Sequence, residues 1–371
     1  MIKGVLRTGL VLFVFFVVGT ASAEDEYVAA KLLEHTPMEY PGSAKARRLE
    51  GWAYYSWVVG KDGRVQEVTI HDSSGIDVFD QEIMQSVKSR VYEPAMLNGF
   101  PVEERHGVTH MTFKLIGAPR GAQRSFTRIY KQAQKDINAG DLAAAQEKIT
   151  ELEAVKFRGL YEELYLQTLL VEYYRATGET TREKAHLDRV MDFYDDGKEK
   201  GMQLVEPEFF LKHLARFYQL EVQDMMLGEA FGSVDRMKKI DPDSELTRRV
   251  AAHAESVAAK VAGREFWMNG ELLPPIYGGD VGRWDARLIG KEIELKEVNG
   301  RLDNIWLTCE GGRRKLPLST VGQGWIIPRG WGDCDLWVFG EVGATVVIAE
   351  LPSGTLAPNV EAEPTVGEDR L

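Results

Sequence analysis

The spacing of apolar residues changes twice along the chain and divides it into three segments. Between residues 36 and 117, apolar and polar positions alternate in short runs, as in β-strands, around one stretch with helical spacing. Residues 123–262 keep helical spacing almost throughout. Residues 264–351 return to short alternating runs, which glycines and prolines separate. The pattern predicts a multidomain α+β protein with a small mixed domain, a helical domain and an all-β domain.

The first segment predicts the element order β-β-α-β. Alternating runs at 52–59 and 65–70 indicate two paired strands, and a third strand is expected at 108–115. Between them, an apolar stripe at spacing four predicts one amphipathic helix, formed by Phe79, Ile83, Val87 and Val91. We expect Asp77 to cap this helix and Pro94 to end it. The product is a small antiparallel sheet with one helix on its face.

An ordered set of short motifs runs through the same segment. It comprises Tyr40-Pro41, Glu50-Gly51, Asp62-Gly63-Arg64-Val65, Ser73-Ser74-Gly75, Phe79-Asp80, Tyr92-Glu93-Pro94-Ala95 and Asn98-Gly99-Phe100-Pro101-Val102. In this order the set resembles the C-terminal domain of TonB-type energy transducers. The resemblance implies a periplasmic β-β-α-β domain that adds an extended peptide to its sheet edge. It implies partners among envelope proteins, including TonB-dependent outer-membrane transporters.

The resemblance also implies which strand receives the peptide. A three-stranded sheet has two edges with unpaired N–H and C=O groups, and an added strand can satisfy them. By the family's topology, the receiving edge is the last strand, with residues Val108, Thr109, His110, Met111, Thr112, Phe113 and Lys114. Two alternatives stay open: this edge accepts a partner, or the helical segment that follows covers it.

The start of the chain has the layout of a secretory signal peptide. Two basic residues precede an apolar run at 10–18, and Ala21-Ser22-Ala23 then offers small residues to a signal peptidase. We expect cleavage between Ala23 and Glu24 and a periplasmic protein. The alternative is an uncleaved inner-membrane anchor.

The resemblance is incomplete outside the binding domain. Family transducers have a membrane helix that usually contains a histidine, and a long proline-rich spacer follows it. The apolar run here contains no histidine, and only about 17 residues separate Ala23 from Tyr40. Peptide binding therefore fits this chain better than energy coupling does.

The helical segment contains two breaks of the same kind. Gly140-Asp141 and Gly178-Glu179 each place a glycine and an acid between two helices. A third break is expected around Leu227-Gly228, and Asp241-Pro242 ends a further helix. The arrangement resembles tetratricopeptide-type helix pairs, which form a groove for peptides. The alternative is an irregular helical bundle.

The third segment predicts a small β-sandwich or barrel. Alternating runs on both sides of Asn299-Gly300 indicate a hairpin. Six of the eight tryptophans lie here, and they either fill the core or stack on a glycan. We place Trp306 and Trp337, which lie within strands, in the core. We place Trp325 and Trp331, which lie beside loops, at the surface.

Composition and cysteine content restrict the function classes. With 45 basic and 57 acidic residues the net charge is −12, which argues against binding nucleic acid. Cys309 and Cys334 cannot form a four-cysteine zinc site. In an oxidising compartment they predict a disulfide, and the alternative is two buried free thiols. We place His106 and His110 on one exposed strand face about 13 Å apart, too far for one metal ion. No catalytic or phosphate-binding motif is found, so we predict no enzyme, cofactor or metal.

We therefore divide the chain into five parts. They are a signal peptide (1–23), a TonB C-terminal-like domain (24–119), a helical repeat-like domain (123–262), a tryptophan-rich β domain (264–351) and a disordered acidic tail (352–371). The leading hypothesis is an exported envelope protein that binds partner peptides by strand addition, in TonB-type transport or envelope assembly. The other hypotheses are a membrane-anchored energy transducer and a periplasmic glycan-binding scaffold.

Overall fold

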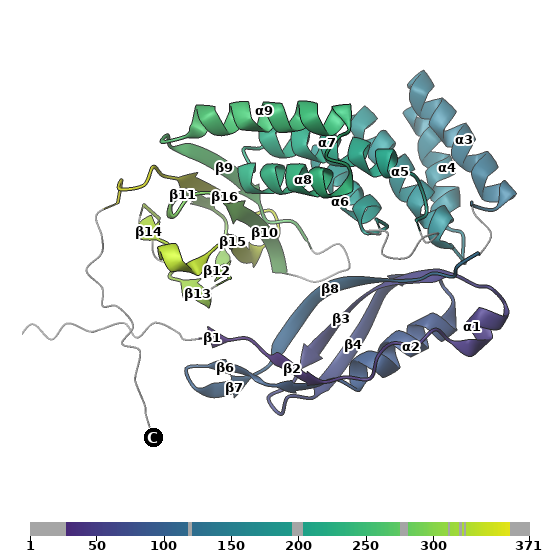
Figure 1. Cartoon of the computed structure of the whole chain (residues 1–371), viewed down its shortest axis with the longest axis horizontal. Coiled ribbons are helices and arrows are strands. Elements are labelled where there is room, and N and C mark those ends of the chain that lie inside the picture. The colour runs from purple at the N-terminus through teal and green to yellow at the C-terminus, as the bar shows by residue number, and fades with distance from the viewer. Residues whose placement is uncertain are drawn as a thin grey trace, which may run out of the picture.

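Three parts follow one another in the computed structural model. It describes residues 27–117, 121–194, 203–274, 281–310, 312–318, 321–322 and 324–356. An N-terminal domain (27–117) lies beneath a helical array (124–261) and a β-sandwich (266–350), which stand side by side (Figure 1). The expected signal peptide and most of the expected acidic tail lie outside the described residues. None of the described helices has the length and apolar character needed to cross a bilayer.

The N-terminal domain has the predicted β-β-α-β core. Strands β3 (Gly51–Val59), β4 (Val65–Ser73) and β8 (Glu104–Phe113) form an antiparallel sheet in the order β4-β3-β8. Helix α2 (Asp77–Lys88) covers one face of this sheet. Its buried Phe79, Ile83 and Val87 pack against Ala53 and Tyr55 of β3. Burial of this apolar stripe is what holds the helix on the sheet.

Short elements complete the domain. They are β1 (Tyr27–Val28), β2 (Lys31–Glu34), α1 (Gly42–Ala46), β5 (Val91–Glu93), β6 (Ala95–Leu97) and β7 (Phe100–Val102). Strand β5 pairs with β2, and β6 pairs with β1 and β7. The predicted helix end is therefore wrong: α2 ends at Lys88, and Val91 joins a strand. Asp77 is the first residue of the helix, and Ile76 occupies the cap position.

The helical array consists of successive helix pairs. Its members are α3 (Arg124–Ala139), α4 (Leu142–Glu153), α5 (Leu160–Thr177), α6 (Thr180–Met191), α7 (Pro207–Gln223), α8 (Leu227–Ile240) and α9 (Glu245–Val261). Gly140 and Gly178 both have a φ of 79°, and the acids after them share a φ of −83° and a ψ of 73°. The first two breaks are thus the same turn, in which glycine takes the left-handed conformation. At the third break Met225 takes this conformation, with a φ of 59°.

The third part is a sandwich of two four-stranded antiparallel sheets. Its strands are β9 (Phe266–Glu271), β10 (Val281–Leu288), β11 (Glu292–Asn299), β12 (Leu302–Cys309), β13 (Gly312–Leu316), β14 (Gly324–Ile326), β15 (Cys334–Glu341) and β16 (Thr345–Glu350). One sheet has the order β10-β15-β12-β13 and the other has the order β14-β11-β16-β9. A 3-10 turn (Arg329–Trp331) precedes β15. The two sheets bury a shared apolar core.

Two expectations for the sandwich have opposite outcomes. The disulfide is confirmed: Cys309 of β12 and Cys334 of β15 are register partners and are bonded. The hairpin at Asn299-Gly300 is wrong, because β11 and β12 belong to different sheets. Gly300, with a φ of 96°, turns the chain from one sheet to the other. A Cβ at Gly300 would lie 2.7 Å from the Cβ of Ala344, which explains the glycine by close packing as well.

The placement of the tryptophans is also wrong in part. Ile305 and Leu307 point into the sandwich core, so Trp306 between them points outward. Leu336 and Val338 set Trp337 outward in the same way. Trp325 and Trp331, expected at the surface, instead pack against the edge of the core. A tryptophan within a strand can point either into the core or outward. It points outward when the residues on either side of it point into the core, as for Trp306 and Trp337.

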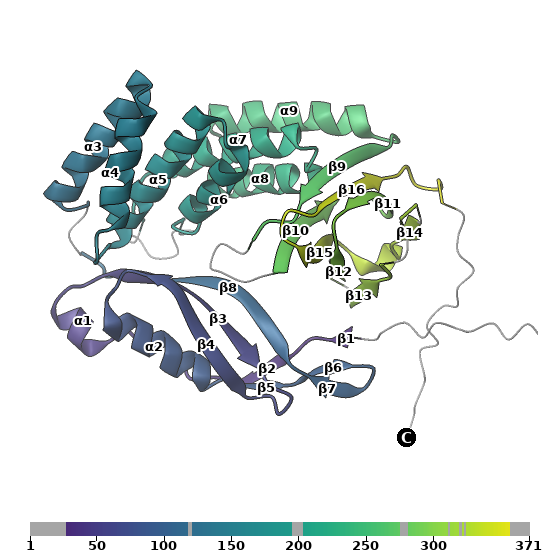
Figure 2. The ribbon, with the colours of Figure 1, turned by 180° about the vertical axis from the view of Figure 1, so that it is seen from behind.

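The helical array packs on the face of the N-terminal sheet that α2 leaves free. Trp52 and Tyr54 of β3 are buried in one cluster with Leu160 and Leu164 of α5 and with Phe193. Seen from behind, the base of the array lies along β8 and β3 (Figure 2). Both faces of the three-stranded sheet are therefore covered, one by α2 and the other by the array.

Candidate functional site

Strand β8 forms one edge of the N-terminal sheet. It pairs with β3 on its inner side, and within the described ranges no strand pairs with its outer side. Val108, near its middle, is 46% exposed. The helical array covers the face of the sheet rather than adding a strand to β8. The outer N–H and C=O groups of β8 thus form the unpaired row that strand addition requires.

The seven residues predicted for this edge are placed on both faces of the sheet. Met111 and Phe113 point to the α2 face, where the Phe113 ring stacks on Phe79 at 4.4 Å. His110 points to the helical array. Thr109, Thr112 and Lys114 are partly buried. Side chains of β8 therefore contact the neighbouring layers, and its backbone is what remains for a partner.

A β-bulge interrupts β8 in its middle. Thr109 pairs with Tyr55 and His106 with Trp57, so Gly107 and Val108 oppose one residue of β3 and have no register partner. The extra residue reverses the alternation of the side chains. The expectation that His106 and His110 share one exposed face is therefore wrong.

The two histidines are packed against aromatic rings on opposite faces. His106 stacks on Trp57 at 4.6 Å, and His110 lies 4.6 Å from the Tyr54 ring and 5.0 Å from Phe193. Burial lowers the pKa of His106, and burial together with Arg189 lowers the pKa of His110 to about 3. Both rings are neutral near pH 7 and act there as packing groups.

A buried ion network joins the N-terminal domain to the helical array. The Glu163 carboxylate of α5 accepts from Arg158 at 2.8 Å and from Arg189 of α6 at 2.7 Å. Both guanidinium groups also contact Asp72 of β4, at 3.4 and 2.8 Å. The backbone of Arg158 adds a bond, since its carbonyl accepts from the Trp52 indole at 3.0 Å. These contacts fix the array on the sheet.

All three parts meet near the end of α6. The Tyr54 hydroxyl of β3 donates to Asp192 at 2.9 Å. Burial and the nearby Asp188 raise the pKa of Asp192 to about 6. Arg236 of α8 and Arg283 of β10 lower the pKa of Asp188, whereas burial, the larger influence, raises it. The end of α6 therefore lies close both to the N-terminal sheet and to β10 of the sandwich.

The family-motif residues build turns and packing rather than the edge itself. A Cβ at Gly51 would lie 2.5 Å from the Phe79 ring, so α2 can approach the sheet only over a glycine. Gly63 has a φ of 75°, and its carbonyl accepts from Tyr92 at 2.8 Å. The Tyr40 hydroxyl donates to the Leu49 carbonyl, and the Asp62 side chain accepts from the Arg64 amide. Pro41 precedes α1, and Asn98-Gly99 forms the turn between β6 and β7. Pro94 and the buried Ala95 are packing residues.

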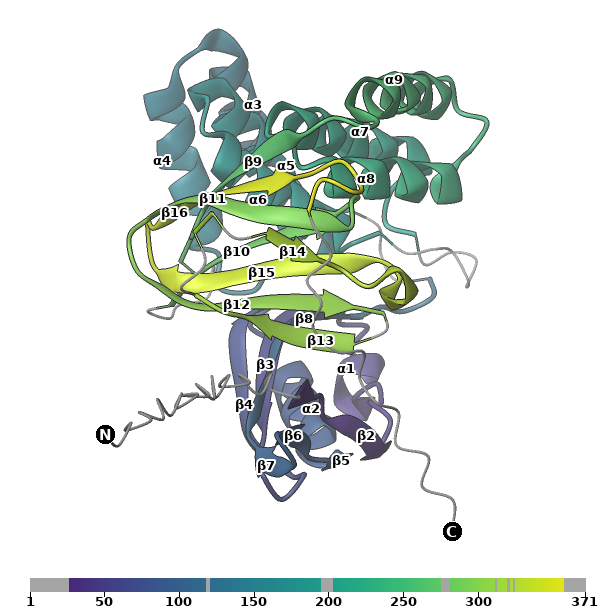
Figure 3. The same ribbon diagram turned by 90° about the vertical axis from the view of Figure 1, so that its left-hand side faces the viewer.

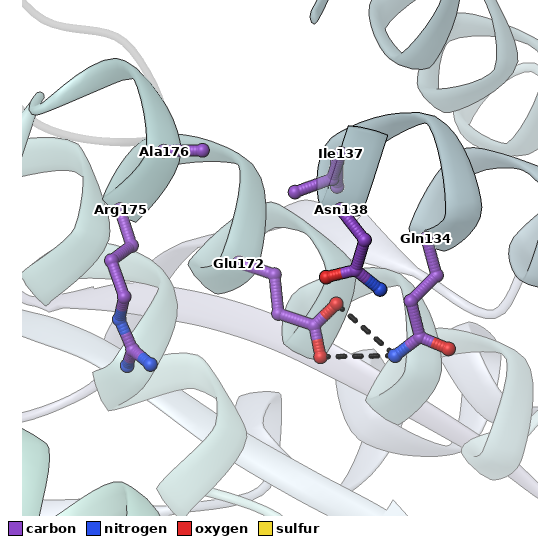
Figure 4. Close-up of a pocket in the computed structure, with 6 residues that line it drawn as sticks. All are labelled: Gln134, Ile137, Asn138, Glu172, Arg175 and Ala176. Carbon is purple, nitrogen blue, oxygen red and sulfur yellow. Dashed lines mark hydrogen bonds between the residues drawn. The ribbon is translucent and has the colours of Figure 1, made fainter. Parts of the chain in front are cut away.

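A separate open pocket of about 490 Å³ lies on the helical array between α3 and α5 (Figure 4). Its lining residues are Gln134, Ile137, Asn138, Glu172, Arg175 and Ala176. The Gln134 amide donates to both carboxylate oxygens of Glu172 at 3.1 Å. Burial raises the pKa of the Glu172 carboxyl. Arg175 is instead paired with Glu183, which lies outside the lining residues, at 2.9 Å.

Comparisons with known proteins concern the N-terminal domain. Residues 36–115 match the family model for the Gram-negative bacterial TonB protein C-terminal. A solution NMR structure of the Pseudomonas aeruginosa TonB C-terminal domain is 29% identical, with a TM-score of 0.21, and the match covers 23% of this chain and 86% of that one. No curated protein matches the chain. In the part of the chain that the structure describes, no group of three or more His, Cys, Asp or Glu side chains is arranged to hold a metal ion.

Proposed function

We propose, from the premise that residues 36–115 form a TonB C-terminal domain, that this chain binds an extended partner peptide along the outer edge of β8. A domain of this family indicates a place in the cell envelope and an association with TonB-type transport. The observation that carries the proposal is the sheet order β4-β3-β8, in which β8 pairs with β3 on its inner side and with none of the described strands on its outer side. A peptide strand there gains backbone hydrogen bonds without displacing any described strand.

The proposed partners are envelope proteins, with TonB-dependent outer-membrane transporters first among them. The helical array and the sandwich serve as a scaffold that holds the binding edge in place. The ion network around Glu163 supports this role, because it ties the array to the sheet through Asp72 of β4 and so keeps the sheet, with β8 at its other edge, in a fixed position. The tetratricopeptide-type character of the array is part of the same proposal.

Proline substitutions at Val108 and Thr109 test the edge directly. Successive residues of a strand point their amides to opposite sides, so we expect one of the two prolines to remove an N–H from the outer edge. We expect that variant to bind synthetic peptides of transporter N-terminal segments at least about tenfold more weakly, a loss of about 1.4 kcal/mol. Fluorescence anisotropy with labelled peptides measures the affinities.

Val108→Ala and Thr109→Ala are the matched controls, because both keep the amide. They should bind within about twofold of the unchanged chain. Thermal unfolding identifies which proline variants stay folded. If both proline variants fold and bind as tightly as the alanine variants, strand addition at β8 is wrong.

The N-terminus of the protein isolated from cells tests the proposed export. We expect mass spectrometry of the intact protein to find a chain that begins at Glu24, and fractionation to place it in the periplasm. The reason is the apolar run followed by Ala21-Ser22-Ala23. A chain that begins at Met1 in the membrane fraction would instead support the anchored energy transducer.

A further inference from the structure

The outer face of the β10-β15-β12-β13 sheet carries a row of aromatic side chains. Trp306 of β12 and Trp337 of β15 are register partners, and the Trp337 ring is parallel to Phe339 at 6.4 Å. All three alternate with residues that point into the core, so they share the outer face. Each remains partly exposed. This row, called the aromatic face below, comprises Trp306, Trp337 and Phe339.

Cationic groups lie over the aromatic face. The Arg283 guanidinium is 4.7 Å from the Trp337 ring, the Arg313 guanidinium is 4.5 Å from Trp306, and the Lys315 ammonium is 6.0 Å from Trp306. Arg283 is also paired with Asp285 at 3.1 Å. Among the residues that the structure describes, no ion pair joins Arg313 or Lys315 to a carboxylate, and the Arg313 Nε is buried without a hydrogen-bond partner. The Arg313 side chain also interacts with the Tyr27 hydroxyl. No described carboxylate neutralises Arg313 or Lys315, so both cations attract an anionic ligand.

The aromatic face looks toward the N-terminal domain. Figures 1 and 3 both show its sheet between the other sandwich sheet and the domain that contains β8. At one end, the Tyr27 ring lies 5.4 Å from Trp306 and 4.9 Å from the Arg313 guanidinium. The Tyr27 hydroxyl interacts with Glu104, the first residue of β8. Tyr27 therefore connects the aromatic face to the start of the proposed binding edge.

The two surfaces also approach each other at the other end. Arg283 and Asp285 of β10 act electrostatically on Asp188, which lies one helical turn before Asp192 of the same chain segment. Asp192 accepts from Tyr54, and Tyr54 stacks beside His110 of β8. The β8 edge and the aromatic face are thus connected by Tyr27 at one end and through Asp188, Asp192 and Tyr54 at the other.

We infer that the aromatic face is a second contact surface for the peptide that pairs with β8, and that it selects an extended acidic peptide. The inference rests on the proposed function. Arg313 and Lys315 supply positive charge to this face of a chain whose net charge is −12, so an acidic segment is attracted to this face rather than to the acidic surface as a whole. The aromatic rings supply flat surfaces on which peptide side chains pack. A peptide is favoured over an acidic glycan because the adjacent β8 edge offers backbone amides and carbonyls in a row.

Selection from a random peptide library tests this inference. The full-length chain is used to select from displayed dodecapeptides, and a selected peptide is then titrated by fluorescence anisotropy. We expect Asp and Glu to be enriched among the selected sequences. We expect the double variant Arg313→Gln/Lys315→Gln to bind the selected peptide about tenfold more weakly and with a smaller dependence on salt.

The control removes the same charge elsewhere. Arg249→Gln/Lys212→Gln neutralises two exposed cations on α9 and α7 of the helical array and should leave the affinity unchanged. Thermal unfolding checks that both double variants are folded. Alginate, an acidic polysaccharide, is titrated as the competing class of ligand.

The outcomes separate the inference from the proposed function. One outcome is that the selected peptides bind the β8 proline variants more weakly, lack acidic residues and bind Arg313→Gln/Lys315→Gln with unchanged affinity. This outcome overturns the inference but not strand addition. Another outcome is that acidic peptides bind Arg313→Gln/Lys315→Gln more weakly but bind both proline variants with unchanged affinity. This outcome supports binding at the aromatic face and overturns strand addition. If no peptide is selected, or if only alginate binds through these cations, the inference is wrong.

Discussion

Replacing Glu163 with alanine is expected to lower the free energy of unfolding by about 3–5 kcal/mol, because two guanidinium groups lose the carboxylate that they share. The Glu163 side chain is 0% exposed, and those of Arg158 and Arg189 are 14% and 11% exposed. With Glu163 absent, the two cations keep their contact with Asp72, which is partly exposed, but lose the fully buried carboxylate. The loss should separate the helical array from the N-terminal sheet before either part unfolds.

Urea unfolding followed by tryptophan fluorescence measures this effect, since Trp52 lies beside both guanidinium groups. Glu208→Ala is the control: it removes a carboxylate from an exposed pair with Lys212 and should cost less than about 0.5 kcal/mol. Equal stabilities of the Glu163→Ala and Glu208→Ala variants would mean that the network does not hold the two parts together.

The stability of the protein is expected to fall as the pH rises from about 5 to about 8. Burial raises the pKa of Glu221 to about 8, and Glu229 adds to the shift while Ser233, Lys184 and Arg236 oppose it. Between its ordinary pKa and about 8, Glu221 is protonated in the folded state and ionised in the unfolded state. Folding therefore binds a proton in this window, and raising the pH favours unfolding.

The variant Glu221→Gln isolates this contribution. Glutamine keeps an oxygen to accept from Ser233, which donates to Glu221 at 2.9 Å, and it cannot ionise. Its free energy of unfolding should fall about 2–4 kcal/mol less between pH 5 and pH 8 than that of the unchanged chain. Glu229 and Glu350, whose pKa values burial raises to about 7, retain part of the slope in both proteins. Parallel pH profiles of the two proteins would contradict the assignment to Glu221.

His110 has the opposite effect on the acid side of the same profile. Its pKa is lower in the folded state than its ordinary value of 6.5, so the stabilisation is complete above pH 6.5 and is lost as the pH falls toward 3. Between about pH 5 and 6.5 the two effects oppose each other, so we expect the loss of stability with rising pH to be steepest above pH 6.5. His110→Phe should flatten the acid limb, whereas His35→Phe, a change to an exposed ring, should not.

The sequence predicted best those elements whose signals are local. Apolar alternation in β3 and the stripe of Phe79, Ile83 and Val87 were sufficient for the β-β-α-β order, because burial of one face imposes these periods. Glycines marked the first two turns of the helical array, because those positions need a left-handed backbone and this requirement is also local. The third turn carried no such signal, because Met225 adopts that conformation without a glycine.

The features that the sequence could not predict depend on contacts between distant residues. Asn299-Gly300 is typical of a hairpin, yet the pairing of β11 with β16 and of β12 with β15 sends the two strands into different sheets. The bulge at Gly107 and Val108 changes which face His110 occupies, and its position follows from pairing with β3. Of the candidate site, the edge strand could be predicted from the family resemblance. The aromatic face could not be predicted, because it depends on which alternate positions of β12 and β15 point into the core, and Trp306 and Trp337 occupy the outward-pointing ones.

The closure of both faces of the N-terminal sheet has a consequence for how a partner is reached. A binding domain at the tip of a long tether can search a wide volume by itself. Here the buried contacts of Trp52 and Tyr54 attach the domain rigidly to a much larger body. In the proposed binding mode, the partner's own unstructured segment provides the reach, and its length sets the distance over which an encounter can begin.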